Sequence, residues 1–195
     1  GPTSVINSSL VGVLKAAQKA GCKKIYGMRN GIEGLLEERI AELKEYIKND
    51  YDVELLKRTP SSFLGTCRYK LPFEKDCAVY EKLFKILDKF DIKHFFYIGG
   101  NDSMDTIAKL SEYAKSINSD ITFMGIPKTI DNDLAYTDHT PGYGSAAKYI
   151  ASVIKEIILD TDTYTTDSVT IVEIMGRNAG WLTAASALAR AEDCT

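Results

Sequence analysis

The run HFFYIGGNDS, residues 94–103, joins an apolar segment to two glycines and three polar residues. An apolar run of this length that ends in a glycine turn predicts a buried strand. Residues 80–90, just before it, space their apolar side chains as one face of a helix does, and residues 106–114, after it, begin another helix. This part of the chain is therefore predicted to form a helix, a strand, a glycine turn and a second helix.

The same alternation continues on both sides of this run. We expect strands at residues 24–27, 94–98, 121–126 and 169–174. We expect helices at residues 8–20, 80–90, 106–114, 144–159 and 180–191. Strands that alternate with helices predict an α/β fold, a three-layer sandwich with a mostly parallel sheet, in which ligands bind beyond the carboxyl ends of the strands.

Residues 30–71 are the least regular part of the chain. Residues 37–46 have a helical pattern, whereas Pro60 and Gly65 indicate loops. We interpret residues 30–71 as an excursion over the surface of the molecule.

Composition excludes several classes of protein. The chain has 195 residues, with 45% hydrophobic and 26% charged residues of both signs, which is typical of a soluble globular domain. The 24 Lys and Arg residues against 27 Asp and Glu residues give a net charge of −3 and form no basic block, so we expect no nucleic-acid partner. No signal peptide or apolar run of membrane-spanning length is evident, so we expect no membrane association.

Cysteine and histidine usage points to a reducing compartment and away from a zinc site or triad chemistry. The two histidines have no Ser or Cys partner at a motif spacing. The four cysteines are Cys22, Cys67, Cys77 and Cys194. They form neither a CxxC pair nor a zinc-type cluster. We therefore expect a cytoplasmic protein.

The first polar loop follows the strand at residues 94–98. Gly99 and Gly100 let the backbone approach a ligand closely, and Ser103 and Thr106 can donate hydrogen bonds near a helix N-terminus, which stabilises anions. The alternative is a plain turn that Asp102 or Ser103 caps.

The second polar loop, PKTIDND at residues 127–133, follows the strand at residues 121–126. One carboxylate there can accept a proton from an attacking alcohol, a second can lie near a metal ion, and Lys128 can neutralise phosphate oxygens. The alternative is an Asp- and Asn-rich turn that caps the next helix.

Two arginines are weaker candidates for phosphate binding. Met175-Gly176-Arg177 follows the predicted strand at residues 169–174, and Arg177 could form paired hydrogen bonds with a phosphate. Arg68 ends the irregular segment and could reach a second phosphate. Taken alone, each arginine is more often an ordinary surface residue, and only its conjunction with the other loops favours phosphate binding.

The two polar loops and the segment Met175-Gly176-Arg177, in this order and at this spacing, resemble the three signature loops of the phosphofructokinase family. Gly1-Pro2-Thr3 resembles the end of that family's N-terminal glycine loop, so the resemblance covers nearly the whole chain. It implies the N-terminal portion of a longer two-domain chain, with a phosphoryl-donor-binding domain at residues 1–142 and the start of a fructose 6-phosphate-binding domain at residues 143–195. It also implies Mg²⁺ as cofactor and a homo-oligomer whose sugar site a neighbouring chain completes.

The resemblance also assigns roles to residues. Asp131 would be the general base for the sugar 1-hydroxyl, with Lys128 as a second catalytic residue. The sugar phosphate would be bound by Thr129, Ile130, Asp131, Met175, Gly176 and Arg177. The phosphoryl donor would be bound by Gly1, Arg68, Gly100, Asp102, Ser103 and Lys128. Asn101 and Asp133 would lie at the metal, although Asn101 stands where most members have an aspartate and therefore brings no charge.

Two positions resemble the pyrophosphate-dependent branch of the family. ATP-dependent members usually have glycine where this chain has Asp102 and Lys128. The side chain and charge of Asp102 would exclude a nucleotide phosphate, whereas Lys128 would bind pyrophosphate. The implied reaction is a reversible phosphoryl transfer from pyrophosphate to the 1-hydroxyl of fructose 6-phosphate. The alternatives are an ATP-dependent 6-phosphofructokinase, a catalytically silent regulatory subunit, and a nucleotide-binding scaffold without catalysis.

Overall fold

The computed structural model describes residues 3, 5–72 and 78–189, and it divides the chain into two compact units, Gly1–Lys128 and Thr129–Thr195. The first unit ends before residue 142, where we expected the donor-binding part to end. Which ligand each part binds stays a prediction.

A strand–helix–strand motif forms the centre of the first unit. β3 (His94–Gly99) and β4 (Thr122–Pro127) are parallel, in a register that pairs His94 with Thr122 and Gly99 with Pro127. α6 (Asn101–Ser116) connects them and begins five residues before the predicted start at Thr106. The strands predicted at residues 94–98 and 121–126 and their parallel pairing are therefore confirmed.

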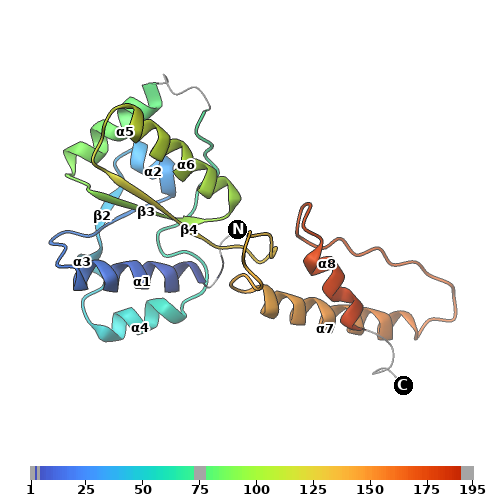
Figure 1. Ribbon diagram of the computed structural model, residues 1–195. Coiled ribbons are helices and arrows are strands. Elements are labelled where there is room, and N and C mark those ends of the chain that lie inside the picture. Colours follow the sequence, from blue (N-terminus) through green and yellow to red (C-terminus); the bar gives the residue numbers. More distant parts are fainter. Residues whose placement is uncertain (1–2, 4, 73–77, 190–195) are drawn as a thin grey trace. The chain divides into compact units, whose positions relative to one another are not determined.

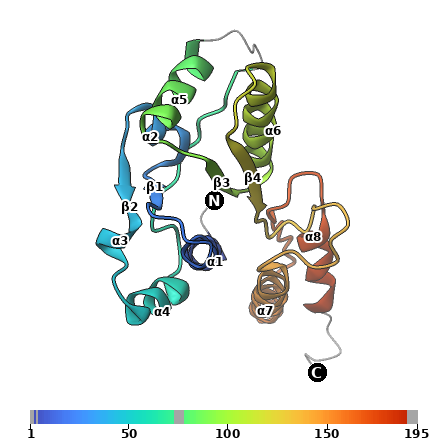
Figure 2. The ribbon, with the colours of Figure 1, turned by 60° about the vertical axis from the view of Figure 1, so that its left-hand side comes forward.

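Helices cover both faces of this strand pair, which confirms the three-layer prediction for the first unit. Figure 1 shows α2 (Gly31–Leu36), α5 (Ala78–Lys89) and α6 on one side of β3 and β4. α1 (Val5–Lys19) and α4 (Asp50–Arg58) lie on the other side, and the turned view in Figure 2 preserves this order.

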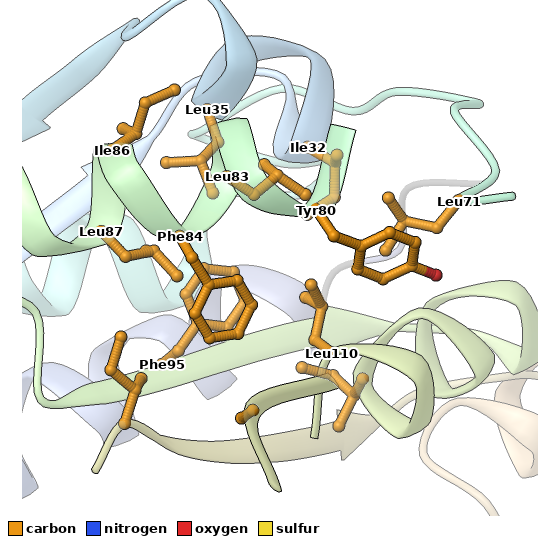
Figure 3. Packing of buried hydrophobic residues seen from close by; sticks show 13 residues of the cluster. Ile32, Leu35, Leu71, Tyr80, Leu83, Phe84, Ile86, Leu87, Phe95 and Leu110 are labelled. Carbon is orange, nitrogen blue, oxygen red and sulfur yellow. The ribbon is translucent and has the colours of Figure 1, made fainter. Parts of the chain in front are cut away.

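The core beneath α5 is the larger of two. α5 buries one apolar face, and Tyr80 and Leu83 are fully buried in it. Figure 3 shows these side chains packed against Phe95 of β3 and Leu110 of α6. Each buried side chain of this size contributes roughly 1.5–3 kcal/mol relative to an exposed one. The period-2 alternation of β3 directs Phe95 to this side and Ile98 to the other.

The second core lies between α1, α4 and the opposite face of the strand pair. Its most deeply buried side chains are Leu14 of α1 and Leu43 of α3 (Leu43–Tyr46). The remaining buried members are Leu10, Val11, Ile25, Ile47, Val53 and Leu56. α1 and α4 both pack through apolar side chains at helical spacing, as the pattern of α1 predicted.

The interpretation of residues 30–71 as a surface excursion is wrong. This segment forms α2, α3 and α4, and it buries Ile32, Leu43 and Leu71. It also supplies β2 (Ile40–Glu42), which pairs with β1 (Tyr26–Met28). Short elements of three to nine residues carry too few periodic positions to reveal themselves in the sequence.

Two predictions near β1 need correction. The predicted strand at residues 24–27 exists as β1, but it pairs antiparallel with β2 and not with the parallel pair. The predicted helix at residues 37–46 is a strand and a short helix, because Glu38 has a left-handed φ of 56° and residues 40–42 form strand hydrogen bonds with β1. Backbone pairing over a distance overrode the local helical pattern.

The second unit is helical among its described residues. α7 (Tyr143–Thr161) confirms the predicted helix at residues 144–159. The predicted helix at residues 180–191 begins as α8 (Trp181–Ala185) and continues as a 3₁₀ turn, η1 (Ser186–Ala189); its last two residues lie outside the described part. α8 and η1 contact α7 and bury Leu182, Ala185 and Ala189.

The predicted strand at residues 169–174 is wrong. No described residue pairs with this segment, and Val169 and Ile171 are 90% and 91% exposed. An extended segment becomes a strand only when a neighbour accepts its backbone hydrogen bonds.

Across the described ranges, none of the helices is both long enough and apolar enough to cross a membrane.

Candidate active site

The carboxyl ends of β3 and β4 lie side by side in the first unit. Gly99 is in register with Pro127, and the Lys128 amide donates a 2.8 Å hydrogen bond to the Gly99 carbonyl. The strand pairing therefore brings the backbone of Lys128 next to the start of the first polar loop.

Glycine is required at the end of β3. A Cβ atom at Gly99 would lie 2.0 Å from the Ser103 hydroxyl oxygen, so a side chain there would displace Ser103. Gly100 is the N-cap of α6, and its carbonyl accepts hydrogen bonds from the amides of Ser103 (2.9 Å) and Met104 (3.0 Å). The alternative in which Asp102 or Ser103 caps the helix is wrong, because both lie within its first turn.

The N-terminus of α6 presents backbone amides and a carboxylate. Thr106 is not a free donor there, because its buried hydroxyl donates to the Asp102 carbonyl at 2.9 Å. An Asp102 carboxylate oxygen lies 3.8 Å from Lys70 Nζ, with side chains 55% and 76% exposed. Such an exposed pair contributes little by itself. A carboxylate in the first turn is stabilised by the positive end of the helix macrodipole.

Arg68 lies in an extended segment beside α6. Exposure alternates along this segment, with Cys67 and Tyr69 half-buried and Arg68 and Lys70 exposed. The Cys67 sulfur lies 3.8 Å from the hydroxyl of Tyr97 on β3. Burial raises the pKa of the Tyr97 phenol, so this hydroxyl stays protonated.

The second polar loop continues into the second unit as a structured turn. The Asp131 amide donates to the Thr129 hydroxyl at 3.0 Å; Thr129 is buried and Asp131 is half-buried. Asp133 is exposed. A Cβ atom at Gly142 would lie 3.1 Å from the Ile130 side chain, so residues 130 and 142 approach closely.

Asn132 organises this loop, and the sequence reading missed it. Its φ is 58°, a left-handed conformation that asparagine tolerates better than most residues. Its amide nitrogen donates to the Asp138 carbonyl (3.1 Å), and its oxygen accepts from the Thr140 amide (2.9 Å). Asn132 thereby fixes the backbone between Asp131 and Asp133. The Asp-Asn-Asp sequence was the available signal, because such residues hydrogen-bond their own turns.

The N-cap of α7 is Gly142, so the alternative in which the second polar loop caps the next helix is wrong.

The third loop precedes α8. Gly176 is buried and has a φ of 148°, which favours glycine, and Arg177 has a φ of 50°. The Gly176 carbonyl accepts a hydrogen bond from the Ala179 amide at 2.9 Å. The side chains of Met175 and Arg177 are exposed.

The predicted site residues divide between the two units. Residues Arg68, Gly100, Asn101, Asp102, Ser103 and Lys128 belong to the first unit. Residues Thr129, Ile130, Asp131, Asp133, Met175, Gly176 and Arg177 belong to the second. Gly1 lies outside the described residues. The peptide bond between Lys128 and Thr129 joins the two sets.

The donor chemistry of the predicted metal ligands fits magnesium. In the part of the chain that the structure describes, no three His, Cys, Asp or Glu side chains gather closely enough to form a metal cage. Mg²⁺ needs no such cage, because it is commonly held by one or two carboxylates together with substrate phosphates and waters. The amide oxygen of Asn101 and the carboxylate of Asp133 are hard oxygen donors of the kind that Mg²⁺ accepts.

Comparison with known proteins identifies similar chains over nearly the full length. The sequence profile of the family described as "Phosphofructokinase" matches residues 1–195. The chain is 45% identical to a pyrophosphate–fructose 6-phosphate 1-phosphotransferase from Xanthomonas campestris pv. campestris, over 97% of this chain and 45% of that protein. It is 35% identical to an ATP-dependent 6-phosphofructokinase from Aliivibrio fischeri, over 94% of this chain and 52% of that protein.

A solved structure is also similar to nearly the whole of this chain. The crystal structure of a pyrophosphate-dependent phosphofructokinase from Nitrosospira multiformis superposes with a TM-score of 0.83 at 41% identity, covering 97% of this chain and 47% of that one. The chain spans about half the length of the relatives that it matches.

Proposed function

This chain belongs to the phosphofructokinase family, and we propose that the whole protein transfers a phosphoryl group from pyrophosphate to the 1-hydroxyl of D-fructose 6-phosphate. The products are fructose 1,6-bisphosphate and phosphate. Pyrophosphate and the product ester have similar transfer potentials, so the reaction runs in both directions.

One observation carries the choice of donor. The relative named as a pyrophosphate–fructose 6-phosphate 1-phosphotransferase is 45% identical to this chain, whereas the ATP-dependent relative is 35% identical over a similar length. The acidic residue in the first turn of α6 and the lysine directly after β4 support the same choice.

The chemistry needs a base and charge neutralisation. In our proposal, the sugar 1-hydroxyl oxygen attacks the terminal phosphorus of pyrophosphate while the bond to the leaving phosphate breaks. Asp131 accepts the hydroxyl proton, and Lys128 neutralises charge that moves to the phosphate oxygens. The hydrogen bond from the Asp131 amide to Thr129 (3.0 Å) supports this role, because it restricts the backbone that carries the base.

We assign the remaining predicted residues to binding. Arg68, Gly100, Asp102 and Ser103 bind the donor, together with Gly1 and Lys128. Thr129, Ile130, Met175, Gly176 and Arg177 bind the sugar phosphate. Asn101 and Asp133 hold a magnesium ion, which when bound neutralises charge on the pyrophosphate oxygens.

Donor selection follows from charge at the N-terminus of α6. The positive end of a helix attracts anions, and the α-phosphate of a nucleotide would benefit from it. The Asp102 carboxylate occupies this position with a negative charge of its own, so it repels that phosphate and fills its space. Lys128 supplies a compensating positive charge for the smaller pyrophosphate.

The setting that we propose for the whole protein is a cytoplasmic homo-oligomer without nucleic-acid or membrane partners. Cys22 and Cys67, the cysteines among the described residues, are both free thiols, which supports a reducing compartment. Residues 1–142 then bind the phosphoryl donor and residues 143–195 begin the sugar-phosphate domain.

The test compares the two donors in the full-length protein. Steady-state phosphorylation of fructose 6-phosphate is measured with pyrophosphate and with ATP, for wild type and for the double variant Asp102→Gly/Lys128→Gly. We expect wild type to prefer pyrophosphate and the double variant to lower the ratio of kcat/KM for pyrophosphate over ATP by at least about tenfold, or ~1.4 kcal/mol. A wild type that uses only ATP would show that the donor assignment is wrong within the right family.

A second variant separates an enzyme from a silent subunit. Asp131→Asn keeps the size of the side chain and removes the base, so kcat should fall by roughly 10²- to 10⁴-fold. An unchanged kcat would favour the regulatory subunit or the scaffold, with the measured activity arising elsewhere.

A further inference from the structure

Asn30 connects the start of α2 to the segment that leads to Arg68. Its amide donates to the Leu64 carbonyl at 2.7 Å, and its side-chain nitrogen donates to the Thr66 carbonyl at 3.3 Å. One residue therefore holds two carbonyls that stand four and two positions before Arg68. All of these groups belong to the first unit.

The conformation of Asn30 is itself held in place. Its φ is 59°, and its side-chain oxygen accepts a 3.0 Å hydrogen bond from Arg39 Nη1. Arg39 is oriented in turn by Glu37 at 2.8 Å. The side-chain amide of Asn30 is thus turned so that its nitrogen faces Thr66 and its oxygen faces the guanidinium.

Gly65 completes the contact from the other side. Its φ is 74°, and a Cβ atom there would lie 2.5 Å from the Asn30 side-chain nitrogen. The loop therefore lies directly against the amide of Asn30, without space for an intervening side chain. Such a close fit transmits a displacement of Asn30 to the loop backbone.

The far end of the same segment is held by α6. Lys109 Nζ donates to the Leu71 carbonyl at 3.1 Å, and Lys70 Nζ lies 3.8 Å from a carboxylate oxygen of Asp102. Arg68 stands between the two attachments, exposed and free to reach outward from a backbone that is held on both sides.

We propose that Asn30 is a positioning residue for the phosphoryl donor, and that it acts by holding residues 64–66 so that the Arg68 guanidinium meets the donor phosphate. This inference rests on the proposed function, because it takes Arg68 as a donor ligand. An arginine side chain has many rotamers, so its contact with phosphate depends on where its backbone is held. Misplacement by about 1 Å can cost on the order of 10²-fold in rate.

The substitution Asn30→Asp tests this with little change of shape. Aspartate also tolerates the left-handed conformation and keeps the oxygen that faces Arg39. It replaces the donor to the Thr66 carbonyl with an acceptor, which repels that carbonyl. Asn49→Asp is the matched control, because Asn49 caps α4 through its oxygen and aspartate caps equally well.

The readout is the separation of the two Michaelis constants in the full-length protein. For Asn30→Asp we expect the KM for pyrophosphate to rise about tenfold while the KM for fructose 6-phosphate stays within about twofold. Asn49→Asp should leave both constants unchanged. An unchanged KM for pyrophosphate, or an equal rise in both constants, would overturn the proposal.

A double-mutant cycle with Arg68→Ala shows whether Asn30 acts through Arg68. If it does, Asn30→Asp in the Arg68→Ala background should change the KM for pyrophosphate by less than about twofold, because the group it positions is already gone. Effects that multiply would overturn the proposal.

Failure of the proposed function is recognised separately. If wild type turns over only with ATP, the same pair of constants is measured with ATP, since Arg68 is assigned to the phosphoryl donor of either kind. If neither donor supports turnover, the proposed function fails. The Kd for pyrophosphate, measured by calorimetry for wild type and Asn30→Asp, then decides the positioning role: a tenfold weaker Kd supports it and an equal Kd overturns it.

Discussion

Gly34 of α2 lies very close to the backbone of the turn that precedes the helix. A Cβ atom built there would lie 1.4 Å from the carbonyl oxygen of Arg29, so no side chain fits without a shift of the backbone. The same turn carries Asn30, whose carbonyl accepts a 3.3 Å hydrogen bond from the Gly34 amide. The need for glycine at this position is therefore steric, and it supports the conformation on which the loop before Arg68 depends.

We expect Gly34→Ala to lower the free energy of unfolding by at least about 2 kcal/mol, because the methyl group must displace backbone atoms. Gly12→Ala is the control. Gly12 is exposed within α1 and has open space around its Cβ position, so alanine should stabilise the helix by roughly 0.5–1 kcal/mol. Urea unfolding of the full-length proteins measures both changes. A neutral Gly34→Ala would show that the turn relaxes at little cost.

At the same scale, the candidate catalytic groups come from the sequence, whereas the residues that hold the neighbouring loops were missed there. Asp131 and Lys128 were recognisable because charged side chains after a strand have few structural reasons to be there. Asn30 was not, because the carbonyls that it holds are brought to it only by the folded chain. For Asn132 the Asp-Asn-Asp sequence indicated a turn, but not which backbone groups its side chain would bind.

Among the elements, β3 shows most clearly how a local pattern becomes a functional position. Its alternation sends Phe95 and Tyr97 to the core under α5 and α6 and Ile98 to the core over α1. Phe95 packs against Phe123 of β4, with ring centroids 5.3 Å apart. The two cores hold the strand from both faces, so its last residue, Gly99, has a defined place beside Lys128.

Tyr97 makes this strand sensitive to alkaline pH. Burial, and then the neighbouring Cys67, raise the pKa of its phenol above the usual value of 10.0. Below pH 10 the phenol is neutral in both the folded and the unfolded chain. Above that pH the unfolded chain loses this proton first, so stability falls as the pH rises toward the folded pKa.

We therefore expect Tyr97→Phe to make the free energy of unfolding less dependent on pH above about 10. Urea unfolding of wild type and Tyr97→Phe at several pH values between 8 and 11 measures the difference, and Tyr51→Phe serves as the control because Tyr51 is 75% exposed. Parallel pH curves for wild type and Tyr97→Phe would contradict the expectation.

The strand predicted wrongly at residues 169–174 shows the converse, that a local pattern alone does not make a strand. Residues 169–174 have the composition of a strand, yet they form none, and Val169 and Ile171 stay exposed. β-Propensity describes a fit to a neighbouring strand rather than a preference of the backbone alone. Without such a neighbour among the described residues, the pattern forms no strand.

On the scale of the whole molecule, the two units differ in how much of their apolar surface is buried. The first unit has two cores, and five residues of α5 are buried. α7 in the second unit has no buried residue along its length. Its C-terminal half borders an open pocket of about 370 Å³, whose lining includes the apolar Ile154, Ile158 and Val172 and the polar Thr161, Asp162 and Thr170.

This difference predicts unequal local stability in the 195-residue chain. Backbone amides of α5 and α6 should exchange hydrogen slowly, because opening them exposes a buried core. Amides of α7 should exchange faster, since little apolar burial opposes their opening. Hydrogen exchange followed by mass spectrometry of peptides from the two regions measures this order. Equal protection of α5 and α7 would show that burial does not control opening here.

The sequence by itself determined the strand–helix–strand unit around residues 94–127, the three polar loops and the family to which they belong. These features depend on periodicity, glycine turns and side-chain chemistry, all of which are local. Only the tertiary structure decided that β1 pairs with β2, that residues 30–71 supply core side chains, and that Asn30 holds the loop before Arg68. Those features depend on contacts between residues that are distant in the sequence, such as the hydrogen bond from Asn30 to Thr66. No local pattern identifies the partner of such a contact.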